Sequence, residues 1–232
     1  MVLSIASLLC GALLVPSIFA QVKIMPMGDS TTAVTCWRGD LAKMLDAQGL
    51  TGKFKMVGTQ RSSCADKGGH EGYPAFKATS KGTFGPKGKL GGIGGEWDDP
   101  KENLLPKVLA KVTPDIVLIL LGINDLTFGG KPPTIVEAFG QFVDEMRKSN
   151  PKMKIVVAQI PPSKSSDTKA LDSAIAAWAP TKSTAASPIT VVDCAAGFNP
   201  SSDTRDGVHF SATGDKKVAT CFATELVKIL KA

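Results

Sequence analysis

Short, uninterrupted apolar runs alternate along the chain with longer amphipathic segments. The run Ile116–Leu121 holds only β-branched and leucine side chains, and it is bounded by Pro114 and Gly122. Such a run is typical of a strand buried on both faces, as in a parallel sheet. Further strands are predicted at Val22–Met27, Lys53–Val57, Lys154–Ile160 and Ile189–Val192.

Apolar residues with helical spacing mark the segments between and after these strands. They predict helices over Cys36–Gln48, over Asp167–Thr184 and from Ser211 onward. Within the second of these helices, Pro180 is expected to cause a break or a kink. Another helix is expected to open at a capping box formed by Thr134 and Glu137 and to end at Asn150.

Strands that alternate with helices predict an α/β fold with a doubly wound, mostly parallel central sheet. In such a sheet, ligands bind at the carboxyl ends of the strands. The stretch from about residue 60 to 100 is rich in Gly, Lys and Ser and shows little periodicity. A loop of this length is usually functional or mobile. With no internal repeat, we expect one domain over residues 21–232.

The composition is that of an ordinary globular protein and excludes wholesale disorder. Of the 232 residues, 43% are hydrophobic and 21% are charged. The net charge of +6 is spread along the chain, without a run of Lys or Arg longer than two. This pattern favours solubility and argues against a nucleic-acid partner.

Residues 1–20 form an apolar segment that carries no charged side chain and is interrupted by Pro16. The small Ala20 and the aliphatic Ile18 fit a signal peptidase site before Gln21. We therefore expect residues 1–20 to be a signal peptide, and the mature chain to be secreted without a membrane partner. The alternative is an uncleaved anchor, for which about 20 apolar residues without proline would be better suited.

Four cysteines lie outside this segment, namely Cys36, Cys64, Cys194 and Cys221. An even number in an oxidising compartment predicts two disulfides, for which three pairings exist. The order of elements in a doubly wound sheet favours Cys36–Cys64 and Cys194–Cys221. The absence of a C-x-x-C motif argues against a zinc knuckle or a redox site.

Polar residues follow three of the predicted strands, at Gly28–Thr32, Gly122–Asp125 and Asp206–His209. A serine nucleophile needs a base, which is usually histidine, and Ser30 and His209 could form such a pair. Asp206, three residues earlier, can fold back onto the ring and fix its tautomer. The backbone N–H of Ser30 and the side-chain amide of Asn124 are candidate donors to a developing oxyanion.

In this order, the segments G-D-S, G-x-N-D and D-x-x-H resemble the motifs of the SGNH (GDSL-type) hydrolases. The resemblance spans essentially the whole mature chain. More narrowly, Gly28–Thr32 with Cys36–Arg38, Phe54–Gly58 and His70–Tyr73 is similar to carbohydrate esterase family 3, the acetylxylan esterases. This resemblance implies a three-layer α/β/α sandwich, catalysis without a metal or other cofactor, and removal of acetyl groups from plant polysaccharide.

Carried over residue by residue, the resemblance assigns four roles. It makes Ser30 the nucleophile, His209 the base, Asp206 the residue that orients the base, and Asn124 a donor to the oxyanion hole. We therefore expect a monomeric, secreted serine esterase that acts on an acetylated polysaccharide or oligosaccharide through an acetyl-enzyme. Two alternatives are a lipolytic esterase for longer acyl chains and a non-catalytic carbohydrate-binding protein on this fold.

The family also supplies a glycine N–H to the oxyanion hole, from a segment that here reads His70–Phe76. In this segment Ala75 stands where relatives usually have a second glycine. Alanine still offers an N–H but tolerates fewer backbone angles than glycine. Either Gly72 or Ala75 could therefore fill the role.

Other polar and aromatic residues have plainer explanations. Asp29 and Asp125 are expected to hold loops, and His70 to be a loop histidine near the site. The sequence separation of His70 and His209 argues against a metal centre. The pair Asp98-Asp99 favours a solvated turn over a Ca²⁺ site. Four aromatic residues could either stack on sugar rings or form small cores, namely Trp37, Tyr73, Phe84 and Trp97.

Overall fold

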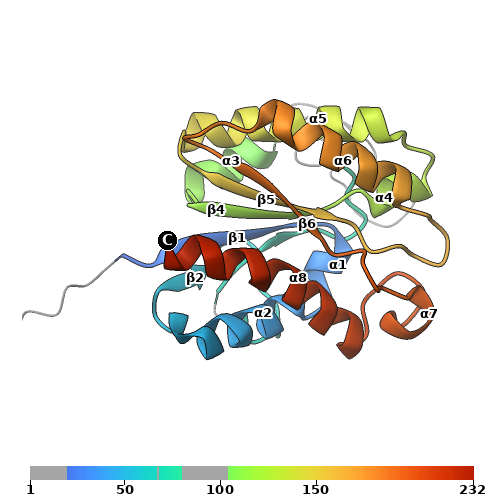
Figure 1. Cartoon of the computed structure of the whole chain (residues 1–232), viewed down its shortest axis with the longest axis horizontal. Coiled ribbons are helices and arrows are strands. Elements are labelled where there is room, and N and C mark those ends of the chain that lie inside the picture. The colour runs from blue at the N-terminus through green and yellow to red at the C-terminus, as the bar shows by residue number, and fades with distance from the viewer. Residues whose placement is uncertain (1–19, 67, 80–103) are drawn as a thin grey trace, which may run out of the picture.

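A parallel sheet with the strand order β2-β1-β4-β5-β6 forms the centre of the protein (Figure 1). The structure is a computed structural model that describes residues 20–66, 68–79 and 104–232. The two-residue β3 pairs with the end of β1, and every strand pairing is parallel. The strands are β1 Val22–Gly28, β2 Phe54–Met56, β3 Glu71–Gly72, β4 Ile116–Leu120, β5 Lys154–Gln159 and β6 Ile189–Asp193. The predicted doubly wound sheet is confirmed.

Burial across the sheet follows the position of each strand. All residues of β4 are buried, because β1 and β5 flank it and helices cover both of its faces. The edge strand β2 instead exposes Lys55 between two buried residues. An uninterrupted apolar run therefore marks the centre of the sheet, whereas an alternating pattern marks its edge.

Helices cover both faces of the sheet, as Figure 1 shows. One face carries α3 (Leu104–Lys111), α5 (Pro132–Ser149) and α6 (Lys169–Lys182). The other carries α2 (Trp37–Leu45), which continues into a π-helical turn at Asp46–Leu50, and α8 (Ala212–Lys231). Three short helices follow strands near the carboxyl edge, namely α1 Ser30–Ala33, α4 Ile123–Thr127 and α7 Pro200–Asp203.

Helices α2 and α8 are joined by an aromatic contact and a buried carboxylate. The Trp37 ring stacks on Phe222 with their centroids 5.0 Å apart. Asp215 of α8 accepts hydrogen bonds from the backbone N–H groups of Cys36 and Trp37, which are unpaired donors at the start of α2. Trp37 is fully buried and belongs to the core, so it offers no surface to a sugar ring.

Two details of the predicted helices are wrong. Helix α5 begins at Pro132, after Lys131, and no side chain caps it, so the capping box at Thr134 does not form. Proline suits a first turn because its fixed φ is already helical and its missing N–H would be unpaired there. Helix α6 does not break at Pro180 but continues to Lys182. Only its last turn is affected by the missing donor.

Both predicted disulfides, Cys36–Cys64 and Cys194–Cys221, are confirmed. The first joins the start of α2 to the loop after β2, and the second joins the end of β6 to α8. Their partners are 28 and 27 positions apart. Closing loops of this size stabilises the folded state by roughly 3.5 kcal/mol each in the chain-entropy description.

Several expectations concern residues that lie outside the described part of the chain. These are the signal peptide, apart from Ala20, and the residues Phe84, Trp97 and Asp98-Asp99. Within the described ranges, no helix has the length and apolar character needed to cross a membrane.

Candidate active site

The end of β1 carries Ser30 into a tight turn at the carboxyl edge of the sheet. A Cβ at Gly28 would lie 2.2 Å from the Leu120 carbonyl oxygen and 2.4 Å from Thr32 Oγ1, so only glycine fits between β1 and β4. Asp29 then caps α1, because its Oδ1 accepts hydrogen bonds from the N–H and the hydroxyl of Thr31, each at 2.8 Å. Ser30 is therefore the first residue of a short, anchored helix.

Ser30, His209 and Asp206 form a continuous chain of contacts. Ser30 Oγ lies 2.9 Å from His209 Nε2, and His209 Nδ1 lies 2.7 Å from Asp206 Oδ2. The Ser30 residue is 8% exposed, whereas the side chains of His209 and Asp206 are 28% and 54% exposed. The hydroxyl thus sits at the bottom of a site whose other two members face solvent.

A tight turn brings Asp206 back onto the histidine ring. Asp206 Oδ1 accepts hydrogen bonds from the N–H groups of Val208 and His209, at 3.0 and 2.8 Å. The turn passes through Gly207, whose φ of 95° favours glycine. Partial burial would raise the pKa of Asp206, but the bonds from the His209 ring and from these two N–H groups hold the pKa well below its usual range. Asp206 is therefore ionised when it faces the ring.

Helix α4 follows β4 at the carboxyl edge of the sheet and carries Asn124. One N–H of the Asn124 amide donates to the Phe76 carbonyl at 2.9 Å, which leaves its second N–H available. The adjacent Asp125 is buried and accepts from the N–H groups of Ala78 and Thr79, each at 2.8 Å. Asp125 therefore fastens the loop after β3 to α4, as the sequence analysis expects.

The segment around Ala75 distinguishes the two candidate amide donors. The Gly72 N–H already donates to His70 Nδ1 at 3.0 Å. Within the described ranges, the backbone N–H groups of Ser30 and Ala75 have no protein acceptor. Ala75 directly precedes Phe76, whose carbonyl orients the Asn124 amide. Of the two candidate amides, only the Ala75 N–H is therefore without a protein acceptor among the described residues.

Ala75 adopts the left-handed conformation, with a φ of 64°, and is the one non-glycine residue of the described chain with a positive φ. This conformation costs an L-residue about 1–2 kcal/mol. Replacing Ala75 by glycine would remove that cost, but glycine loses more backbone entropy on folding, which cancels part of the gain. We expect Ala75→Gly to raise the free energy of unfolding by about 0.5–1 kcal/mol, measured by urea denaturation.

The matched control for this prediction is Ala177→Gly, at an exposed position in the interior of α6. There glycine should lower the free energy of unfolding by about 1 kcal/mol, because Ala177 is helical. A loss of stability in both variants would contradict the strain at Ala75.

Buried titratable groups surround the site. Burial raises the pKa of Asp29 to about 6, against hydrogen bonds from Thr31, and the nearby Asp125 carboxylate raises it further. Burial lowers the pKa of His70 to about 4, and the Arg38 charge adds to this effect. His70 therefore stays neutral at physiological pH and accepts the Gly72 N–H. Tyr73 is only 3% exposed, so it too belongs to the core.

The loop after β5 was not among the candidate segments, yet it contacts both the turn that carries His209 and helix α4. The Lys164 N–H donates to the Gly207 carbonyl at 2.8 Å, and Ser166 Oγ lies 3.0 Å from Thr127 Oγ1 of α4. The polar run that follows Pro161-Pro162 at a strand end was the available signal.

The chain is similar to known esterases in sequence and in structure. The sequence profile of the GDSL-like lipase/acylhydrolase family matches residues 27–217. An acetyl esterase variant crystallised with an acetate ion is 29% identical at a TM-score of 0.76, over 91% of this chain and 99% of that chain. A carbohydrate esterase family 3 protein from Talaromyces cellulolyticus gives the same identity, TM-score and coverage.

A family 3 carbohydrate esterase from Clostridium thermocellum is 25% identical at a TM-score of 0.72, over 91% of this chain and 98% of that chain. No curated protein sequence matches significantly. The family profile spans most of the chain, and these esterases align along nearly their whole lengths. The chain therefore belongs to the GDSL-like lipase/acylhydrolase family and is a carboxylic ester hydrolase.

Proposed function

We propose that this protein is a secreted acetyl esterase that removes O-acetyl groups from plant cell-wall polysaccharide such as xylan. The observation that carries the proposal is the chain of contacts from Ser30 Oγ through His209 to Asp206, at 2.9 and 2.7 Å. A hydroxyl, an imidazole and a carboxylate in this order form the arrangement that activates a serine for attack on an ester.

In the first half of the reaction, Ser30 Oγ attacks the acetyl carbonyl carbon while His209 Nε2 takes the hydroxyl proton. The ionised Asp206 accepts the Nδ1–H of the ring, which leaves Nε2 free as the acceptor and stabilises the imidazolium that forms. The ring then gives its proton to the leaving sugar oxygen. This step releases the deacetylated sugar and leaves an acetyl group on Ser30.

Three N–H donors would stabilise the negative oxygen of the tetrahedral intermediate. They are the backbone N–H of Ser30, the second N–H of Asn124 Nδ2 and the backbone N–H of Ala75. Each lacks a protein acceptor in the described residues. Ser30 is held by α1, the Asn124 amide by the Phe76 carbonyl, and Ala75 by the loop that Asp125 binds. Donors that are oriented in advance contribute several kcal/mol to such a step.

In the second half, His209 takes a proton from water, and the hydroxide attacks the acetyl group on Ser30. The tetrahedral intermediate collapses when the imidazolium returns the proton to Ser30 Oγ, which releases acetate. Each bond formed or broken involves the ester, water and these side chains, so we expect no cofactor and no metal in the reaction.

The acetyl and carbohydrate assignments rest on the family resemblance and on the similar structures. An acetate ion accompanies one of these proteins, and two are carbohydrate esterases of family 3. Secretion is supported by the apolar residues 1–20 and by the two disulfides. The exposure of Asp206 and His209 suits an ester on a bulky polymer. We further expect the protein to act as a monomer.

The proposal is tested by comparing esters that differ in acyl chain length and in the molecule that bears the acyl group. We expect kcat/KM to be highest on 4-nitrophenyl acetate and to fall steadily to the octanoate, and acetate to be released from acetylated xylan. Release from acetylated chitin and from a triglyceride should be slower. A preference for octanoate would instead indicate a lipolytic esterase, and binding to acetylated xylan without acetate release would indicate a non-catalytic carbohydrate-binding protein.

A further inference from the structure

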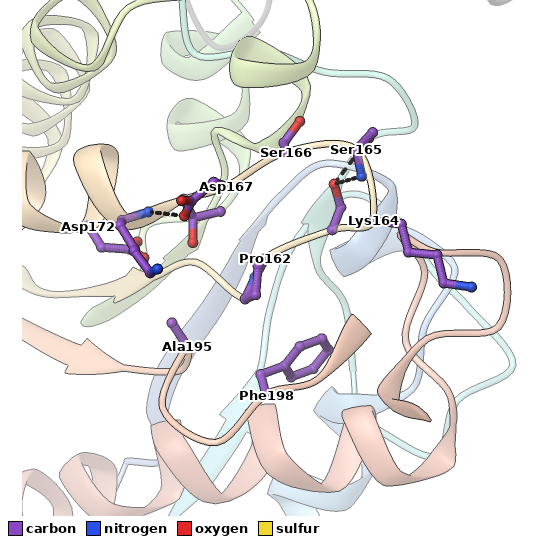
Figure 2. A pocket seen from close by; sticks show the side chains of 11 residues that line it. Pro162, Lys164, Ser165, Ser166, Asp167, Asp172, Ala195 and Phe198 are labelled. Carbon is purple, nitrogen blue, oxygen red and sulfur yellow. Dashed lines mark hydrogen bonds between the residues drawn. The ribbon is translucent and has the colours of Figure 1, made fainter. Parts of the chain in front are cut away.

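An open hollow of about 560 Å³ lies at the carboxyl ends of β5 and β6 (Figure 2). The loop that follows β5 forms its wall, from Pro162 to Lys169, and Ala195 and Phe198 after β6 form its floor. Its volume falls within the range of small-molecule sites.

The lining of the hollow combines polar and apolar surface. Eight of its eleven residues are polar or charged, including Lys164, Ser165 and Asp167, which are exposed. Pro162, Ala195 and Phe198 supply the apolar side chains of the lining. Sugars need both kinds of surface, because their hydroxyls form hydrogen bonds and their C–H faces pack on apolar groups.

The hollow adjoins the site that contains Ser30. The side chain of Lys164 lies against Gly207, in the turn between Asp206 and His209, where an added Cβ would be 3.2 Å from Lys164 Cβ. At the other end of the same loop, Ser166 contacts Thr127 of α4. The wall of the hollow therefore runs between the two segments that carry His209 and Asn124.

We propose that this hollow is an accessory subsite that binds a sugar unit of the polymer whose acetyl group is attacked at Ser30. The inference rests on the proposed function and adds to it, because it assigns the β5–α6 loop and Ala195 to recognition of the carrier chain. We expect a small ester such as 4-nitrophenyl acetate not to occupy the hollow, because neither Ser30 nor His209 lines it. Its hydrolysis is therefore independent of the subsite.

Filling the hollow tests this assignment. Ala195→Trp should lower kcat/KM on an acetylated xylohexaose about ten-fold, which corresponds to about 1.4 kcal/mol of lost binding. Its kcat/KM on 4-nitrophenyl acetate should stay at the wild-type value. The matched control is Ala196→Trp, because Ala196 is the exposed next residue and does not line the hollow. This control should leave both substrates unaffected.

A second variant removes the Ser165 hydroxyl and the negative charge of Asp167 without adding bulk. Ser165→Ala combined with Asp167→Asn keeps the Asp167 Oδ1 acceptor of the Lys169 N–H, which is 3.0 Å away, so the start of α6 should remain intact. We expect KM for the acetylated xylohexaose to rise several-fold while kcat stays unchanged.

Equal losses on both substrates, or no loss on the acetylated xylohexaose in either variant, would overturn the subsite. If the wild-type protein hydrolyses 4-nitrophenyl acetate but releases no acetate from the oligosaccharide, the carbohydrate part of the proposed function fails instead. The two failures are therefore distinguishable.

Discussion

Ser30→Ala is expected to lower kcat on 4-nitrophenyl acetate by about 10⁴-fold or more, because no other group in the contact chain can form the acetyl-enzyme. The Ser30 Oγ lies 2.9 Å from His209 Nε2, so the variant loses the attacking atom while the ring and its carboxylate remain. The remaining N–H donors and substrate binding would leave a small residual rate. Mass spectrometry after a rapid quench should detect an acetyl adduct on the wild-type protein and none on the variant.

The fold should survive this substitution, since the Asp29 cap of α1 accepts from Thr31 rather than from Ser30. The melting temperatures of the variant and of the wild type should therefore be close. Ser202→Ala provides a matched control at an exposed position and should retain full activity. Near-wild-type turnover by the Ser30→Ala protein would remove Ser30 from the mechanism.

Asp206→Asn is expected to lower kcat on the same ester on the order of 10³-fold, somewhat less than the roughly 10⁴-fold of a buried triad aspartate. Asparagine can still accept the Val208 and His209 N–H groups through its oxygen, so the turn should persist. Its NH₂ group would then face His209 Nδ1 and favour the tautomer with the proton on Nε2. A protonated Nε2 cannot accept the proton of Ser30.

Asp193→Asn is the matched control for this prediction. Asp193 is also an exposed aspartate that accepts two backbone N–H groups of a turn, those of Ala195 and Ala196 at 3.1 and 2.9 Å. Its replacement should leave kcat unchanged. Full activity in Asp206→Asn, or an equal loss in Asp193→Asn, would mean that the carboxylate of Asp206 does not orient the base.

The strands and the position of the site were predictable because the local pattern of apolar and polar residues indicates which segments are buried. The run Ile116–Leu121 contains β4 because each of its side chains had to be apolar at the centre of a covered sheet. A parallel sheet brings its carboxyl ends to one edge, so polar residues after different strands could be expected to meet there. The short helix α1 and the two-residue β3 were missed because neither is long enough to show a period.

Local pattern was insufficient where a contact between distant segments decides the outcome. The sequence left Gly72 and Ala75 as equal candidates, and only the bond from Gly72 to His70 occupies one amide. Likewise, an aromatic residue looks the same in sequence whether it faces a sugar or the core. Trp37 is buried because Phe222, far along the chain, packs on its ring.

By itself, then, the sequence determined the α/β class and the side chains that would gather at one edge of the sheet, and it favoured the cysteine pairing that the structure confirms. These features follow from burial and from the order of elements along the chain, and both can be inferred from short stretches of sequence. The tertiary structure decided which backbone N–H groups of the described residues remain without an acceptor, that Ala75 is left-handed, and that the β5–α6 loop forms the wall of a hollow beside the site. Those features depend on atoms that folding brings together from distant positions, and no local pattern records them.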